Sequence, residues 1–379
     1  MDAFIGAGIA VLAMYSAVKL RTSDKDKIQM TFRNLNYRVK DREPKLIRTR
    51  RTYDYTTYTY HVPYGLTDDG KLEVLEKVLD RPVDISFTDG KLHVKVYANN
   101  LPSRVHYDWA PSNGWKVPIG KALPGIVYHD FDKIPHMSIA GMTRQGKTVL
   151  LKILFAHLIN SRPNDVELTI IDLKGGLEFE KYRNYTQVKE VLSDVNEAYT
   201  ALTILLNEVR KDLSRFKAKG FANIIDTPIK KRKFIIVDEG AELAPPPFLS
   251  REEKRTYQFC QHALSEIARI GGALGYRLIF ATQYPTADTL PRQVKQNADA
   301  KISFRLPSEI ASRVAIDENG AERLSVVGRA IYRTADKYIV QVPYVTDEEI
   351  TERLGKYDER NNARTAEEPP SRENPVKFG

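Results

Sequence analysis

The sequence predicts an α/β fold built on a central, mostly parallel sheet, preceded by a small α+β domain and a single N-terminal transmembrane helix. Three observations lead to this prediction. Apolar strand-like segments alternate with helical segments from about residue 115 to 345, which is typical of a parallel sheet covered by helices. Residues from about 30 to 120 are instead rich in Tyr, Thr and Val with Pro and Gly breaks, which favours short strands. The first 20 residues are largely apolar.

The elements of the small domain follow from local patterns. Alternating Thr and Tyr predict a strand within Thr52–Val62, and Leu72–Leu79 is expected to form a short helix. Val83–Phe87 and Lys91–Tyr97 are expected as two strands joined by an Asp89-Gly90 hairpin turn.

The larger domain is expected to contain one long amphipathic helix, Gln187–Lys219, whose apolar side packs in the core. Its strand candidates are short and apolar: His136–Ala140, Val166–Leu173, Lys233–Glu239, Tyr276–Gln283 and Lys301–Leu306.

The N-terminal segment Ala3–Val18 carries no charge, and Lys19 and Arg21 follow it. Spanning a bilayer needs ~20 apolar residues, with ~17 as a lower limit, so the segment suffices if Lys19 reaches back to the interface. Basic residues after the apolar run argue against a secretory signal peptide. The positive-inside rule then predicts a single-pass protein of the cell membrane with its bulk in the cytoplasm. The alternative is a buried or peripheral N-terminal helix.

The distribution of charge and the cysteine content bear on the cellular compartment in which the protein works. Residues 19–52 hold twelve Lys or Arg and four Asp or Glu, so they account for most of the formal net charge of +9. The rest of the chain is close to neutral. The single cysteine, Cys260, can form neither an internal disulfide nor a zinc cluster, which favours a reducing compartment.

A phosphate-binding loop is expected at Gly141–Thr148, whose sequence fits G-x-x-x-x-G-K-[ST] between an apolar strand and a helical segment. Its backbone N–H groups and the following helix N-terminus would face phosphate oxygens. Lys147 would reach the β- and γ-phosphates, and the Thr148 hydroxyl would bind Mg²⁺. The residues expected to bind ATP are Gly141, Met142, Thr143, Arg144, Gln145, Gly146, Lys147, Thr148 and Val149.

An acidic pair follows a second apolar strand, in Phe234–Val237 and then Asp238-Glu239. In P-loop ATPases such an Asp helps to hold Mg²⁺, and the adjacent Glu suits the general base that polarises water. The alternative is a strand that merely ends in surface acids. Gln283, at the end of a later strand, is expected to contact the γ-phosphate or its water. Together these features predict a RecA-like P-loop ATPase that uses ATP and Mg²⁺.

The sequence resembles the FtsK/SpoIIIE–HerA family of DNA-pumping motors, and the match extends over roughly residues 115–345. Its order and spacing are carried by Ile139–Thr148, Ile171–Lys174, Val237–Glu242, Gly275–Pro285, Asn297, Lys301–Arg305, Ser312-Arg313, Asp317 and Gly320–Glu322. Within that family it looks most similar to the coupling proteins of Gram-positive conjugative plasmids and integrative elements. The resemblance implies a homo-hexameric motor that delivers relaxase-bound DNA to a secretion channel without sequence specificity.

Together, the residue patterns and the resemblance predict a transmembrane anchor at 1–20, a basic juxtamembrane segment and α+β domain at 21–114, an FtsK-like motor domain at 115–350, and a charged, disordered tail at 351–379. Chromosome translocases of the family carry several transmembrane helices and a winged-helix module. Neither is expected here, so sequence-directed chromosome pumping is not expected either.

The sequence gives weaker signals for residues that act between subunits or on DNA than for the nucleotide-binding motifs. A ring motor needs an arginine that reaches the γ-phosphate of a neighbouring subunit, and Arg269 and Arg313 are the candidates, with an ordinary surface role as the alternative. The basic cluster Lys230–Lys233 either contacts DNA or forms a solvated loop. Arg48–Arg51 could meet anionic lipid, and Tyr53–Tyr60 either stack on single-stranded DNA or pack within a strand.

Three functions remain open on this basis. The first is a membrane-tethered, DNA-dependent ATPase that translocates or delivers DNA in conjugative transfer. The second is a viral or plasmid DNA-packaging or assembly ATPase. The third is a membrane scaffold that binds nucleotide without turnover, against which Glu239 and Gln283 argue because a scaffold needs neither.

Overall fold

The computed structural model describes residues 22–66, 71–286 and 289–360, and these form two compact units that divide between Leu101 and Pro102. This division comes earlier than the predicted one between 114 and 115. No helix among the described residues is long and apolar enough to cross a membrane. The predicted transmembrane helix, residues 1–20, lies outside the described residues.

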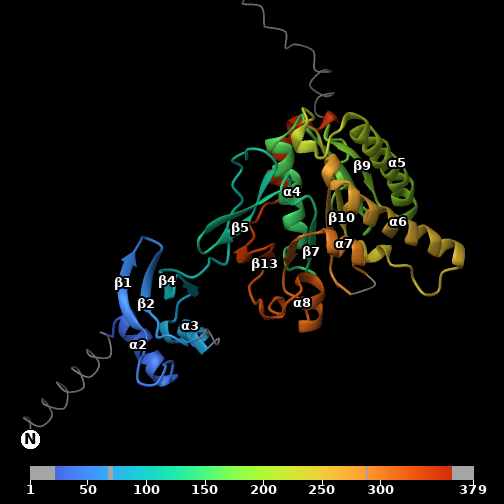
Figure 1. The fold of residues 1–379 in the computed structure, drawn as a ribbon. Helices are drawn as coiled ribbons and strands as arrows, with labels where there is room; N and C mark the ends of the chain where they lie inside the picture. The colour runs from blue at the N-terminus through green and yellow to red at the C-terminus, as the bar shows by residue number, and fades with distance from the viewer. Residues whose placement is uncertain (1–21, 67–70, 287–288, 361–379) are drawn as a thin grey trace, which may run out of the picture. The chain divides into compact units, whose positions relative to one another are not determined.

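The N-terminal unit is a four-stranded antiparallel sheet with helices on one face (Figure 1). Tyr58 and Tyr60 pack against Ile28 and Phe32 of the first helix in the core of this unit. Asp89 and Gly90 take positive φ values of 52° and 68°, so the predicted hairpin is confirmed. In order across the sheet, the strands are β1 (Lys45–Arg51), β2 (Tyr55–His61), β4 (Lys91–Tyr97) and β3 (Val83–Thr88), and the helical segments are α2 (Asp24–Asn34), η1 (Lys71–Glu73) and α3 (Val74–Leu79).

The large unit is built on a ten-stranded mixed sheet. Six neighbouring strands are parallel, and the four at one end are antiparallel, so the predicted α/β fold is confirmed with an added antiparallel region. Across the sheet the order is β6 (Gly125–Asp130), β5 (Lys116–Ala122), β14 (Lys337–Gln341), β13 (Arg329–Arg333), β12 (Ala300–Ser303), β7 (Met137–Ala140), β11 (Tyr276–Thr282), β10 (Arg232–Asp238), β8 (Val166–Asp172) and β9 (Val188–Leu192).

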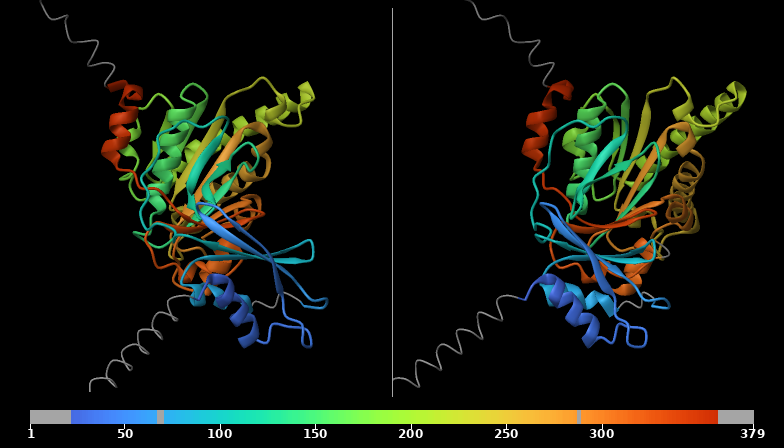
Figure 2. Two further views of the ribbon diagram at one scale, coloured as in Figure 1. Left: turned by 90° about the vertical axis from the view of Figure 1, so that its left-hand side faces the viewer. Right: turned by 60° about the vertical axis from the view of Figure 1, so that its left-hand side comes forward.

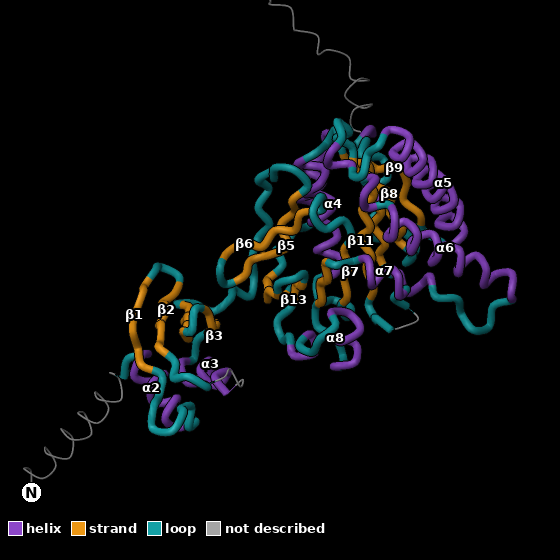
Figure 3. The backbone as a smooth tube through the Cα atoms, in the orientation of Figure 1, coloured by secondary structure: helices purple, strands orange, loops and turns teal. Residues whose placement is uncertain are grey.

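Helices cover both faces of this sheet (Figures 2 and 3). Alternate strand residues divide between two cores: Ile170 and Ile236 lie in the core under α4 (Lys147–Ser161). Their neighbours Ile171 and Ile235 lie in the core under α5 (Val195–Lys219) and α6 (Arg251–Ile270). The remaining helical segments are α7 (Arg292–Asn297), α8 (Glu309–Ile316), α9 (Asp347–Leu354), η2 (Glu180–Tyr182), η3 (Ile224–Asp226), η4 (Gly240–Leu243), η5 (Gly272–Leu274), η6 (Ala321–Arg323) and η7 (Gly355–Tyr357).

Two sequence expectations need correction. The segment expected as one helix, Gln187–Lys219, contains the strand β9 followed by α5. The break has a local cause: the Asp194 side chain accepts hydrogen bonds from the N–H groups of Asn196 and Glu197, and so caps a new helix. The tail expected from 351 begins too early, because α9 continues to Leu354, which is fully buried. Residues 361–379 of that tail lie outside the described residues.

Candidate nucleotide-binding site

The predicted phosphate loop connects β7 to α4 at the carboxyl edge of the parallel strands. Gly146 has a φ of 113°, which an L side chain rarely adopts. A Cβ on Gly141 would lie 2.7 Å from the Phe304 Cβ, so the backbone can approach this closely only as glycine. These two positions explain why the loop requires its glycines.

Neighbouring segments hold the loop in place. The Gly141 N–H donates to the Thr282 carbonyl at 3.2 Å, and the Gly328 N–H donates to the Gln145 carbonyl at 3.0 Å. Thr282 ends β11, whereas Gly328 directly precedes β13. The parallel and antiparallel parts of the sheet therefore both position the loop.

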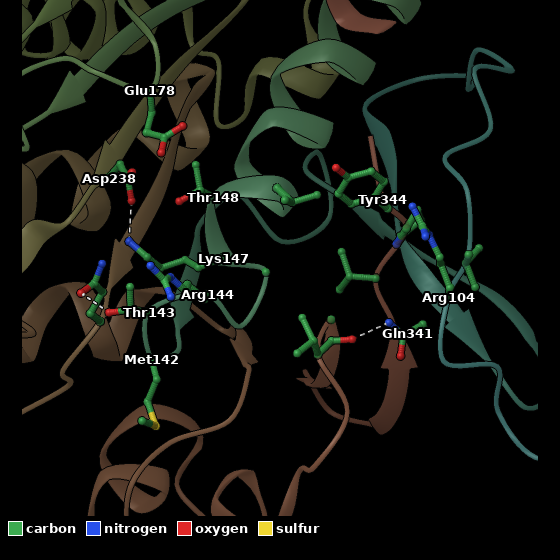
Figure 4. Close-up of a pocket in the computed structure, with 18 of the residues that line it drawn as sticks. Arg104, Met142, Thr143, Arg144, Lys147, Thr148, Glu178, Asp238, Gln341 and Tyr344 are labelled. Atoms are coloured by element: carbon green, nitrogen blue, oxygen red, sulfur yellow. Dashed lines mark hydrogen bonds and ion pairs between the residues drawn. The ribbon is translucent and has the colours of Figure 1, made fainter. Parts of the chain in front are cut away.

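The predicted acidic pair lies against the loop lysine, and Figure 4 shows the contact with Asp238. The Lys147 Nζ is 2.5 Å from the Asp238 Oδ1 and 3.5 Å from the Glu239 Oε2. Lys174 Nζ lies 3.0 Å from the same Glu239 oxygen. The side chains of Lys147, Asp238 and Glu239 are all buried, so the alternative of surface acids at a strand end is wrong.

Glu239 is held in an unusual way. Its backbone is left-handed, with φ 66° and ψ 60°, a conformation that costs a non-glycine residue about 1–3 kcal/mol and that is enriched at functional sites. Its Oε1 accepts hydrogen bonds from the Gln283 N–H at 2.9 Å and from the Thr282 Oγ1 at 3.2 Å. The carboxylate is thereby fixed at the end of β11.

The charge state of Glu239 follows from this environment. Burial by itself raises the pKa of Glu239, but Lys147, the Gln283 N–H and Lys174 more than offset it. The pKa of Glu239 therefore lies below its ordinary value of 4.5, and the group is ionised at neutral pH. An ionised, oriented carboxylate is what a general base requires.

Gln283 also contacts the loop itself, because the Thr143 Oγ1 donates to the Gln283 Oε1 at 3.1 Å. The residue expected as a sensor thus touches both the loop and the candidate base. Its role stays a prediction, but its placement suits it.

Sequence reasoning assigned no role to Asp172, although the family resemblance included it. Asp172 is opposite Asp238 in the β8–β10 register, and its Oδ2 accepts from the N–H groups of Glu178 and Phe179. Burial, together with the nearby Asp238, raises the pKa of Asp172, which the two N–H groups partly oppose. Asp172 therefore orders the loop after β8, which carries Lys174 to Glu239.

A cavity of about 800 Å³ extends from the loop to a second wall (Figure 4). In that wall the Arg104 guanidinium lies 5.2 Å from the centre of the Tyr344 ring. The two chain segments that form this wall are joined by a hydrogen bond, which the Tyr344 N–H donates to the Val105 carbonyl at 2.7 Å. No local motif marked these residues, because they come from opposite ends of the large unit. The wall consists of Ser103, Arg104, Val105, Val327, Gly328, Gln341, Val342, Pro343 and Tyr344.

The site fits a magnesium nucleotide. Its volume lies within the range of about 300–1,000 Å³ that is usual for small-ligand pockets. Mg²⁺ normally takes only one or two carboxylates, with phosphate oxygens and water completing its shell. Asp238 and Thr148, which both line the cavity, would supply the protein's share.

The two candidate arginines do not line this cavity. Arg269 donates to Glu266 at 2.9 Å and Arg313 to Asn319 at 2.6 Å, and the side chains are 52% and 65% exposed. Neither acts on its own chain's site, so a role in the site of a second subunit stays a prediction.

The basic cluster Lys230–Lys233 is largely engaged within the protein. Arg232 pairs with Asp132 at 2.9 Å, Lys231 with Glu167 at 2.7 Å and Lys233 with Glu208 at 2.7 Å. These contacts favour a structural role for the cluster over DNA contact.

The fold and the site define a P-loop ATPase domain. Residues 106–242 match the FtsK/SpoIIIE family, so the large unit carries an FtsK/SpoIIIE domain and the resemblance drawn from the motifs is confirmed. The prediction of an ATP hydrolase of this family is confirmed at the level of this domain.

Curated relatives with this domain are DNA translocases. The chain is 29% identical over 259 residues to DNA translocase FtsK of Leptospira interrogans, a match that covers 63% of this chain and 26% of that protein. It is 28% identical over 251 residues to DNA translocase FtsK of Streptococcus pneumoniae, covering 63% of this chain and 32% of that protein. The chain thus spans about a quarter to a third of the length of these relatives.

Solved structures show the same fold. The pCW3 conjugation coupling protein TcpA, in a monomer form with ATPγS, superposes with a TM-score of 0.65 at 22% identity, covering 88% of this chain and 99% of that one. The Type VII secretion ATPase EccC of Thermomonospora curvata superposes with a TM-score of 0.54 at 21% identity, covering 68% of this chain and 33% of that one.

Proposed function

We propose that this protein is an ATP-driven DNA translocase that delivers DNA during conjugative transfer, held at the cell membrane by residues 1–20 with its bulk in the cytoplasm. The observation that carries the proposal is the buried, ionised Glu239, fixed by Gln283 beside the loop lysine. The names of the relatives support DNA as the transported polymer. The TcpA likeness, which extends over nearly all of both chains, supports the conjugative role.

The residues of the site have separate roles in ATP hydrolysis. The loop N–H groups bind the phosphates, while Lys147 exchanges its ion pair with Asp238 for the β- and γ-phosphates. Asp238 and Thr148 would hold Mg²⁺, whose charge would offset that of the phosphates. Glu239 orients and polarises a water, and Gln283 links that carboxylate to the loop through Thr143.

ATP turnover of the full chain, with and without single- and double-stranded DNA, tests this function. We expect turnover that rises with DNA and disappears in Lys147→Ala and Glu239→Gln. ATP binding without turnover under every DNA condition, in a sample shown to be hexameric, would instead support the nucleotide-binding scaffold.

The expected partners are DNA, five further copies of the chain in a hexameric ring, a relaxase and secretion-channel proteins. A DNA-packaging or assembly ATPase is the second candidate within the motors. It differs by having no relaxase partner, so co-purification of a relaxase encoded beside this gene separates the two.

The second wall of the cavity is proposed to hold the base of the nucleotide. Tyr344→Ala should weaken ATP binding about fivefold or more, because ring contacts with a base are worth about 1–3 kcal/mol. Tyr128→Ala is the matched control, since Tyr128 is similarly exposed in the same unit and does not line this cavity. Titration with a fluorescent ATP analogue measures the effect. Equal ATP affinity of the two variants would show that this wall does not bind the base.

The trans-acting arginine can be identified by mixing subunits. If Arg313 or Arg269 reaches a neighbour's site, its Ala variant should bind ATP normally and lose about 10³-fold or more in turnover. Mixing that variant with Glu239→Gln subunits should restore part of the turnover, because some interfaces then combine an intact arginine with an intact base. Full turnover by both single variants would exclude both residues.

A further inference from the structure

We propose that the open face of the N-terminal sheet binds the backbone of single-stranded DNA. This face is the side of the four-stranded sheet opposite α2 and α3, which cover its other side (Figure 1). The inference concerns a unit separate from the ATPase domain, and it does not depend on ATP hydrolysis.

Strand register identifies the side chains that share this face. Residues directly paired across strands point to the same side, and Tyr60, Leu92 and Val94 point into the core. The residues that alternate with them form three rows across the sheet, and a further pair, Tyr55–Tyr97, lies on the same face beside the third row. These rows are Lys45–His61–Lys91–Thr88, Arg48–Thr59–His93–Ser86 and Arg50–Thr57–Lys95–Asp84.

The face is strongly basic. Lys45, Arg48, Arg50, Lys91 and Lys95 lie on it, and Asp84 is the single carboxylate in the three described rows. None of the five cations forms an ion pair with another described residue within this unit, although the Lys95 Nζ lies 4.7 Å from the centre of the Tyr55 ring. They differ in this from Lys231–Lys233, whose charges are neutralised by nearby carboxylates.

The spacing of the cations suits an extended polyanion. Neighbouring strands lie about 4.8 Å apart, and side chains on one face recur about every 6.6 Å along a strand. Positive charges therefore form a grid that a flexible strand can follow without sequence readout. Thr57 and Thr59, which lie between the cations, offer hydroxyl donors to phosphate.

An aromatic side chain adjoins this grid. Tyr53, in the turn between β1 and β2, is 94% exposed, and its ring can stack on a base. The tyrosine run is thus divided: Tyr58 and Tyr60 pack in the core as strand residues, whereas Tyr53 is free of it. Binding to a lipid surface would instead use large exposed apolar side chains. The three rows contain Thr, Ser and His between their cations, and the adjoining Tyr55 and Tyr97 are half-buried and buried.

Fluorescence anisotropy with labelled oligothymidylate and the full chain, without nucleotide, tests the proposal. The test variant is Arg48→Gln/Arg50→Gln/Lys91→Gln, all of which are exposed. The matched control is Lys25→Gln/Arg38→Gln/Lys77→Gln, which removes the same charge from exposed positions outside the three rows. Circular dichroism and DNA-free ATP turnover of both variants verify that they fold.

We expect the test variant to lose affinity on the order of tenfold, with the slope of log K against log salt reduced by about 2, because three phosphate contacts contribute about 0.7 each. The control should match the wild type. Tyr53→Ala should lose about fivefold or more with an unchanged slope, whereas Tyr64→Ala, equally exposed, should not. Unchanged affinity and slope in the test variant would overturn the proposal. The proposal would also be overturned if the test variant lost affinity only for duplex DNA. A loss of affinity only for phosphatidylserine vesicles would overturn it as well and would indicate that the face binds a lipid surface.

Discussion

Glu239→Gln should bind ATP with near-normal affinity and lose its hydrolysis by about 10²–10⁴-fold, the contribution typical of a general base. The substitution keeps the shape of the side chain. It also keeps an oxygen that can accept from the Gln283 N–H, which lies 2.9 Å from the Glu239 Oε1 in the wild type. It removes the negative charge that polarises water. Single-turnover hydrolysis and equilibrium ATP binding measure the two effects separately.

Glu242→Gln is the matched control for this prediction. Glu242 belongs to the same acidic segment, but its side chain is exposed, whereas that of Glu239 is buried against Lys147. It should hydrolyse ATP at the wild-type rate. Normal hydrolysis by Glu239→Gln would show that another group activates water, and loss of ATP binding would show that the substitution disturbs the loop.

Lys147→Ala should abolish ATP binding and hydrolysis and should also destabilise the large unit. Lys147 lies between two buried carboxylates, Asp238 and Glu239, so its removal leaves their charge only partly compensated by Lys174. Breaking such a buried pair costs about 3 kcal/mol in the free energy of unfolding. Urea unfolding measured by fluorescence reports this unit alone, because the two tryptophans, Trp109 and Trp115, both belong to it.

The pH dependence gives this prediction a second test. In the wild type, the folded-state pKa of Glu239 lies below its ordinary value of 4.5. The stability that Glu239 contributes is therefore complete above pH 4.5 and is lost as the pH falls below that value. The difference between wild type and Lys147→Ala should be largest at neutral pH and should shrink on acidification. A difference that stays constant with pH would mean that lost packing, not charge, destabilises the variant.

The parts of the site that the sequence could predict are those defined by short, contiguous motifs. The loop, Asp238 and Glu239 each follow an apolar strand, and parallel strands bring their carboxyl ends to one edge of a sheet. Gln283 could be placed for the same reason. The order of strands then puts β11 between β7 and β10, so that its last residues meet both the loop and the base.

The parts that could not be predicted depend on contacts distant in sequence. Arg104 and Tyr344 meet only because the chain before β5 runs beside the chain after β14. The antiparallel strands β5, β6, β13 and β14 have weak local signals, since their stability comes from pairing with one another. Likewise, β1 is exposed along its whole length, and no apolar periodicity marks it. Its pairing with β2 decides which cations share the open face.

Displacement of streptavidin from the ends of biotinylated single- and double-stranded DNA tests most directly whether ATP hydrolysis moves DNA. We predict displacement on at least one DNA form that requires ATP, is absent in Glu239→Gln and is retained in Glu242→Gln. ATP turnover that DNA stimulates but that displaces streptavidin from neither form would contradict translocation.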